Sequence, residues 1–300
     1  MRIKAKYYML EAVNKTNLLK PIKGDEAKRL KEVLTMMLDD FQQRCANNNI
    51  TPFLVYGSAL GAYRHKGFIP WDDDVDVAMT REDWEKLKTI FKDVFTDKYE
   101  LEGPNFDGKD SSTAWGKLFL KGTRYVELMN INTPYRKGLF IDIFIIDGLS
   151  DNVFVRKIDY YIARVARFIA NSMPYCQYPS TLMTEVMSAS METKCYLLFR
   201  KTLGFLFSWV SHKTWLSIYD KFISRHRKTK LTIMNYDDAI TERDIWFPVK
   251  KIPFENIMAN VPNDIEGYLE MAFGKSYMKL PPEREREQHF CVELDFGEYK

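Results

Sequence analysis

Two aspartates at a spacing of two could share a divalent metal ion. Asp74 and Asp76 alternate with Val75 and Val77, a period that is typical of a β-strand. Residues two apart on a strand point to the same face, so we expect the two carboxylates to lie side by side. Like charges this close repel unless a cation separates them, and oxygen ligands suit Mg²⁺ or Mn²⁺. The alternative is a solvated acidic turn, but the flanking Trp71 and the valines favour a partly buried site.

A third acidic residue interrupts a strongly apolar segment. Asp142 separates Leu139-Phe140-Ile141 from Ile143-Phe144-Ile145-Ile146, and residues on both sides of this predicted strand are apolar. A buried carboxylate is costly unless it is paired or binds a metal. A half-exposed strand is the alternative, but we interpret Asp142 as a third carboxylate of the same site.

A glycine and a serine follow the short apolar run of residues 53–56. Gly57-Ser58 would let backbone amides and a hydroxyl approach a phosphate, at the start of a short helix predicted over residues 58–65. The pair alone is a weak signal, and it is no P-loop because Gly-Lys-Ser/Thr does not follow. The order of strand, Gly-Ser, helix, Asp-x-Asp strand and a later strand with a third aspartate resembles the nucleotidyltransferase superfamily. In that superfamily three carboxylates hold metal ions that bind a nucleotide's phosphates.

The segment from Gly57 to Val77, with Arg-His-Lys-Gly-Phe-Ile-Pro-Trp-Asp-Asp-Asp at its centre, closely resembles the LicD family. Three further blocks are similar to that family: residues 117–127, Phe140-Ile141-Asp142-Ile143-Phe144, and residues 261–289. The resemblance covers most of residues 30–290 and is poorest over 151–230. Ile145 stands where the family often has Pro, and Phe273 where Tyr is common, but neither departure touches the expected metal ligands.

The resemblance implies a role for each matching residue. Asp74, Asp76 and Asp142 would be the catalytic carboxylates and bind Mg²⁺ or Mn²⁺, and Asp142 is a candidate to accept the acceptor's hydroxyl proton. Gly57 and Ser58 would contact the donor phosphate, with Arg64, Lys66 and Lys117 as partners for its charge. The alternatives are a solvated Lys66, a structural His65, and side chains of Arg64 and Lys117 that serve the fold. His289 is a candidate to close over the site on the resemblance alone.

The resemblance also implies an enzyme: a CDP-alcohol-dependent phosphotransferase of the LicD type. We expect metal-dependent transfer of phosphocholine from CDP-choline to a hydroxyl of a glycan precursor of lipopolysaccharide, teichoic acid or capsule, with release of CMP. The alternatives are a ribitol- or glycerol-phosphate donor, nucleotidyl transfer, or a non-catalytic protein that binds glycan or membrane. Choline would need an aromatic box, for which Trp71, Tyr63 and Trp115 are candidates, although most aromatic residues belong to cores.

The elements that must position these residues predict an α/β (α+β) fold with a mixed sheet, flanking helices and an additional helical segment. Apolar residues at helical spacing predict a helix over 25–46, with Asp25 as its cap, and Thr80 is expected to cap the next helix. Strands are expected over 74–79, on either side of a turn at 121–122, and over 139–146. We divide the chain into an N-terminal extension (1–24), a catalytic core (25–150), a helical segment (151–235) and a C-terminal region that packs back on the core (236–300).

Composition excludes several classes of protein. The chain of 300 residues carries a net charge of +3, which with the absence of a known motif argues against nucleic-acid binding. Four scattered cysteines form no CxxC pair, and neither a signal peptide nor a membrane span is recognisable. We therefore expect a cytoplasmic protein. Residues 194–230, with nine Lys/Arg and one acid, are a candidate for peripheral contact with the membrane's inner face or with a lipid-linked glycan; helices packed on the core are the alternative.

Overall fold

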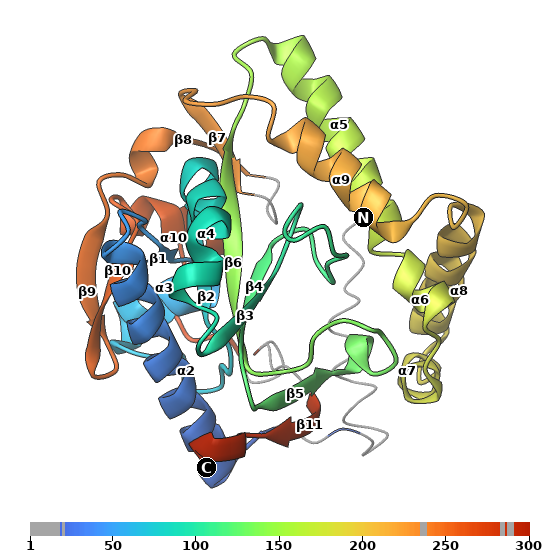
Figure 1. Ribbon diagram of the computed structural model, residues 1–300, viewed down its shortest axis with the longest axis horizontal. Helices are drawn as coiled ribbons and strands as arrows, with labels where there is room; N and C mark the ends of the chain where they lie inside the picture. The colour runs from blue at the N-terminus through green and yellow to red at the C-terminus, as the bar shows by residue number, and fades with distance from the viewer. Residues whose placement is uncertain (1–18, 20–21, 235–238, 283–285, 287–290) are drawn as a thin grey trace.

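A mixed sheet of seven strands forms the centre of the molecule, which confirms the predicted α/β class (Figure 1). The computed structural model describes residues 19, 22–234, 239–282, 286 and 291–300. Most of the predicted N-terminal extension, and His289, lie outside these residues. The strand order is β1-β2-β6-β4-β3, and β7 continues the sheet beside the far end of β6 and pairs with β8. These strands are β1 (Phe53–Leu54), β2 (Asp76–Thr80), β3 (Tyr99–Glu102), β4 (Gly116–Leu120), β6 (Phe140–Gly148), β7 (Leu231–Met234) and β8 (Ile240–Glu242).

Three helices pack on this sheet where the apolar periodicity places them. In α2 (Gly24–Ala46) the buried face includes Leu30, Leu34 and Phe41, but its N-cap is Lys23, so Asp25 lies in the first turn and does not cap it. The short α3 (Tyr56–His65) connects β1 to the acidic segment. Helix α4 (Arg81–Val94) begins as predicted, because the side chain of Thr80 accepts a hydrogen bond from the amide of Asp83.

The C-terminal part of the chain returns to the core through helix α10 and strand β11. Strands β9 (Lys250–Phe254) and β10 (Ile257–Val261) form an antiparallel pair, and α10 (Ile265–Phe273) follows them with Gly274 as its C-cap. The hydroxyl of Tyr268 on α10 accepts a hydrogen bond from the amide of Tyr56 at the start of α3, at 2.8 Å. Strand β11 (Cys291–Asp295) pairs with β5 (Arg124–Glu127), so β4 and β5 flank the turn at Lys121-Gly122 without forming a hairpin.

Five helices lie between β6 and β7, two strands that pair directly with each other. They are α5 (Val153–Ala170), α6 (Met173–Gln177), α7 (Thr181–Met187), α8 (Met191–Leu206) and α9 (His212–Ile223). We call residues 153–223 the helical insertion. It lies on the side of the molecule opposite β9 and β10 (Figure 1). In the described part of the chain no helix is both long and apolar enough to be a membrane span.

A buried cluster of charges attaches the helical insertion to the sheet. Arg81, at the start of α4, donates two hydrogen bonds of 2.8 Å to Asp147 on β6 and one of 2.9 Å to Asp220 on α9. Arg81 and Asp147 are at most 2% exposed. Breaking such a pair from one side leaves a buried charge without its partner, so the cluster fixes α9 against the end of β6.

Candidate active site

Four charged residues form a row across the middle of the sheet. Asp76 on β2 is the register partner of Asp142 on β6, which in turn faces Lys117 on β4, and Lys117 faces Glu102 on β3. Neighbouring strands lie about 4.8 Å apart, and register partners point to the same face of a sheet. The two predicted aspartates from distant parts of the sequence are therefore direct neighbours.

Asp142 is buried but has two polar partners, both on the side of β4. Its Oδ1 accepts a hydrogen bond of 2.7 Å from the indole N–H of Trp115 and lies 3.2 Å from the ammonium of Lys117. Burial raises the pKa of the Asp142 carboxyl, and the charge of Lys117 opposes that rise. The costly buried acid expected from the sequence is thus paired, as the desolvation argument requires.

Lys117 provides the positive charge of this row. It is 3% exposed, and its ammonium also lies 3.6 Å from Glu127 and 3.3 Å from the centre of the Phe140 ring. Burial alone would lower the pKa of Lys117, but Asp142 and Glu127 more than offset burial, so the pKa is raised and the side chain stays charged. Lys117 therefore neutralises the carboxylates, and its contact with a donor phosphate stays a prediction.

A small pocket beside this row is lined by four carboxylates. Asp73, Asp74, Glu127 and Asp142 line it, and the apolar walls come from Leu30, Leu34, Tyr125, Leu139 and Phe140. Carboxylate oxygens of Asp72, Asp73 and Asp74 lie within 4.8 Å of one another. Acidic oxygens gathered around one pocket are the ligand set that a hard divalent cation prefers. The residues present therefore fit Mg²⁺ or Mn²⁺.

The structure corrects the predicted position of Asp74. Strand β2 begins at Asp76, so Asp74 belongs to the extended segment that leads into the strand. Val75 and Val77 are fully buried, as the alternation predicts. The carbonyl of Val75 accepts a hydrogen bond from the amide of Asp142, at 3.0 Å, so this segment already lies along β6. Asp74 therefore reaches the pocket from the approach to the strand.

Gly57 and Ser58 support the acidic segment from the start of α3. Ser58 is buried, and its hydroxyl accepts a hydrogen bond of 2.9 Å from the amide of Asp76. A Cβ atom added to Gly57 would lie 2.6 Å from Oδ2 of Asp72, so only glycine permits this close approach. Tyr56 just before them has a φ of +45°, a strained value for a non-glycine residue. Gly57 and Ser58 are thus next to the acidic segment, and their contact with the donor phosphate stays a prediction.

Arg64 lies at the other end of α3 and is turned toward the segment after α10. Its guanidinium donates to the carbonyl of Tyr277 at 2.7 Å and to Nε2 of His65 at 2.9 Å. Arg64 lies six positions after Ser58, or about 9 Å along the helix axis. These contacts favour the alternative in which Arg64 serves the fold, and a role with phosphate stays a prediction.

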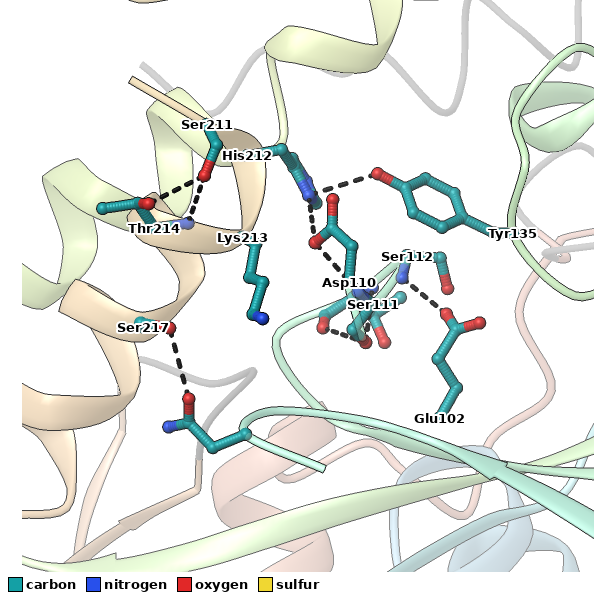
Figure 2. Close-up of polar contacts among 12 residues, drawn as sticks. Glu102, Asp110, Ser111, Ser112, Tyr135, Ser211, His212, Lys213, Thr214 and Ser217 are labelled. Atoms are coloured by element: carbon teal, nitrogen blue, oxygen red, sulfur yellow. Dashed lines mark hydrogen bonds and ion pairs between the residues drawn. The ribbon is translucent and has the colours of Figure 1, made fainter. Parts of the chain in front are cut away.

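The loop over residues 103–115 joins this site to the helical insertion. Its Ser112 amide donates to Glu102, the last residue of the charged row, and its Asp110 lies 2.9 Å from Nδ1 of His212 on α9 (Figure 2). The hydroxyl of Tyr135 lies 3.1 Å from the same nitrogen. The loop ends at Trp115, the hydrogen-bond donor to Asp142. The loop therefore contacts the start of α9 at Asp110 and ends at the residue that donates to the central carboxylate.

Sequence reasoning missed some of these residues and gave others a different role. Asp73, Glu102 and Glu127 were not assigned to the site, because nothing in the local pattern distinguishes them from surface acids. Trp115 was a candidate for the head group but is a hydrogen-bond donor to Asp142, with its ring stacked on Phe144 at 5.5 Å. Its spacing of two from Lys117 was an available signal that both side chains share one face.

Comparisons with known proteins find a family model that is similar to the part of the chain that holds this site. Residues 49–167 match the family model described as LicD/FKTN/FKRP, nucleotidyltransferase domain. The lipopolysaccharide cholinephosphotransferase LicD of Haemophilus influenzae is 27% identical over 261 residues, which cover 86% of this chain and 93% of that protein. An uncharacterised protein of Rickettsia prowazekii is 39% identical over 57 residues, 19% of this chain and 21% of its own length. The resemblance inferred from residues 57–77 is thereby confirmed.

Proposed function

We propose, on the premise that residues 49–167 form a LicD-family nucleotidyltransferase domain, that this chain transfers phosphocholine from CDP-choline to a glycan hydroxyl and releases CMP. The observation that carries the proposal is the pocket lined by Asp73, Asp74, Glu127 and Asp142 beside the row that contains Asp76. The Haemophilus relative, a lipopolysaccharide cholinephosphotransferase by name, aligns with 86% of the chain and supports lipopolysaccharide as the class of acceptor. We place the reaction on the cytoplasmic side of the membrane.

A divalent cation, Mg²⁺ or Mn²⁺, belongs to this proposal. Asp74, Asp76 and Asp142 would hold it, and Asp73 and Glu127, which line the same pocket as Asp74 and Asp142, would be further oxygen ligands. When bound, the ion supplies positive charge to the donor's diphosphate and orients the phosphorus for in-line attack.

The chain's own groups account for the rest of the reaction. The acceptor oxygen forms a bond to the phosphorus that carries choline, and the bond from that phosphorus to the oxygen shared with CMP breaks. The hydroxyl proton passes to a carboxylate, for which Asp142 is suited because burial raises the pKa of its carboxyl. Trp115 and Lys117 hold that carboxylate in one orientation, at 2.7 Å and 3.2 Å. CMP then leaves with the pair of electrons of the broken bond.

Trp71, beside the acidic segment, is the ring that we propose for the choline head group. The guanidinium of Arg286 lies over the ring of Trp71 at 4.4 Å from its centre. A ring that accepts a cation on its face is also suited to a quaternary ammonium group, whereas ribitol and glycerol offer no charge. Trp71 directly precedes Asp72, so a head group on this ring would lie beside the carboxylates.

The test is CMP release by the purified protein from CDP-choline, CDP-ribitol, CDP-glycerol and CTP, each with Mg²⁺ and with a chelator. The proposal predicts Mg²⁺-dependent CMP from CDP-choline, which water can release slowly even before the acceptor is supplied. Release from another CDP-alcohol would keep the mechanism and overturn the donor. If no donor gives CMP, metal-dependent binding of CDP-choline is measured next, and its absence would overturn the proposed function.

A further inference from the structure

Helix α5 buries mainly small residues and exposes most of its large apolar ones. Its buried face, which packs on α9, includes Ala163, Ala166 and Ala170. The opposite face carries apolar side chains at spacings of three and four, which makes a continuous stripe along the helix. These exposed residues are Phe154, Ile158, Tyr161, Val165 and Phe168. Phe154 is 73% exposed. A helix that served only to cover a core would place these side chains inward.

Helix α8 extends this stripe into a wider surface. Leu198, Phe199, Phe205 and Leu206 are exposed on α8, and Trp209, just after it, is 79% exposed. The rings of Phe168 on α5 and Phe199 on α8 lie 6.1 Å apart, which joins the two helices' apolar residues into one surface. We call this the α5–α8 face. Exposed apolar patches of this extent mark interaction sites.

The charges around the α5–α8 face are mainly positive. Residues 151–230 contain thirteen Lys and Arg against five Asp and Glu, a net charge of +8, whereas the whole chain carries +3. On α5 the cations are Arg156, Lys157, Arg164 and Arg167, and the single acid, Asp159, is buried. On α8, Lys194 is exposed near the first turn and Lys201 is half-buried. A partner that covers this face must therefore be apolar at its centre and anionic at its edge.

We propose that the α5–α8 face docks the protein on the surface of an anionic lipid bilayer. Large apolar and aromatic side chains enter the boundary between headgroups and acyl chains, while the surrounding Lys and Arg bind anionic headgroups. Trp209 suits the headgroup level because its ring is amphipathic. A second copy of the chain fits less well. In a symmetric dimer through this face, the Lys and Arg residues around one copy, which we call the basic rim, would lie against those of the other copy and repel them.

The position of the face in the chain suits peripheral docking. The helical insertion leaves and re-enters the sheet between the paired strands β6 and β7, and the cluster of Arg81, Asp147 and Asp220 anchors it there. The stripe therefore contacts lipid without any rearrangement of the sheet that holds Asp76 and Asp142. Docking is independent of the donor and the reaction proposed above, so each proposal can fail alone.

Vesicle co-sedimentation of the full chain tests this inference. The vesicles contain equal parts of phosphatidylglycerol and phosphatidylethanolamine, and vesicles of phosphatidylcholine alone serve for comparison. The apolar variant combines Phe154→Ser, Phe205→Ser and Trp209→Ser, and its matched control combines Met258→Ser with Leu280→Ser, two exposed apolar residues away from the face. We expect salt-sensitive binding to the anionic vesicles, a loss of roughly tenfold or more in the apolar variant, and no loss in the control.

A second set of variants tests the basic rim. Lys157→Glu, Arg164→Glu and Lys194→Glu together should weaken binding by roughly fivefold or more for each charge changed. The control changes the exposed Lys250, Lys251 and Lys275 to Glu and should bind like the wild type. All variants should unfold at the wild-type temperature and release CMP at the wild-type rate, which separates docking from catalysis. Wild-type protein that ignores anionic vesicles, or a dimer that dissociates in the apolar variant, would overturn the proposal.

Discussion

Replacing Lys117 by methionine separates the charge of this side chain from its packing. Methionine keeps about the length and the apolar stem of lysine. The loss of folding stability therefore comes mainly from the carboxylates of Asp142 and Glu127, which lose an ammonium group at 3.2 Å and 3.6 Å. Breaking a buried ion pair from one side costs about 3–5 kcal/mol. Asp142 keeps its hydrogen bond from Trp115, and its buried carboxyl can take up a proton. We therefore expect the free energy of unfolding to fall by about 3 kcal/mol, the lower end of that range.

The assay is chemical denaturation of the wild type and Lys117→Met with and without Mg²⁺. A cation held by the same carboxylates replaces the missing charge, so Mg²⁺ should stabilise the variant more than the wild type. Lys121→Met, at the exposed turn after β4, is the control and should change stability by less than about 0.5 kcal/mol. A variant as stable as the wild type, or one indifferent to Mg²⁺, would refute the reasoning that Lys117 balances a cation site.

Two further predictions concern the supports of the site. Gly57→Ala places a Cβ atom 2.6 Å from Oδ2 of Asp72, so this carboxylate must move. Because the side chain is flexible, we expect the free energy of unfolding to change by no more than about 1 kcal/mol. The displaced carboxylate should lower the rate of CMP release roughly tenfold to hundredfold. Equal activity in that variant would remove Asp72 from the account. Arg81→Met leaves Asp147 and Asp220 buried without their cation and should lower the free energy of unfolding by about 3–5 kcal/mol, measured by urea denaturation. Wild-type stability there would mean that the cluster does not anchor α9.

The sequence predicted the elements of the core well because local patterns determine them. The apolar spacing of α2, the Thr80 cap of α4 and the apolar run of β6 each need only neighbouring residues to be recognised. The start of β2 was placed too early because the alternation of Asp74 to Val77 continues into an extended segment that lies along β6 before the strand begins.

Pairings between distant strands could not be predicted in the same way. The register of Asp76 beside Asp142, and of Lys117 beside both Asp142 and Glu102, depends on the order of strands in the sheet. Glu127, which lines the pocket, lies on β5, and β5 pairs with β11 from the far end of the chain. No signal within a single segment reveals such contacts, so the sequence indicated the chemistry of the site but not its full set of residues.

The helical insertion shows a different limit of sequence reasoning. Periodicity in α5 identifies two faces, one of alanines and one of large apolar residues, and burial of the larger residues is the ordinary expectation. The structure reverses this, because Ala163, Ala166 and Ala170 allow α9 to pack closely. Residues 194–230 were a candidate for contact with a membrane, with helices packed on the core as the alternative. In the structure α9 packs on α5, whereas large apolar residues of α5 and α8 are exposed. That contact stays a proposal.

The most direct test of the central claim compares CMP release by the wild type and by Asp142→Asn, with CDP-choline and Mg²⁺. Lys117 keeps Glu127 at 3.6 Å as a partner, so the variant should fold, and Asp151→Asn, an exposed acid before α5, is the control. We predict Mg²⁺-dependent release by the wild type and the control, and a loss of about 10²–10³-fold or more in Asp142→Asn. Full activity in folded Asp142→Asn would contradict the claim that this carboxylate site carries the reaction.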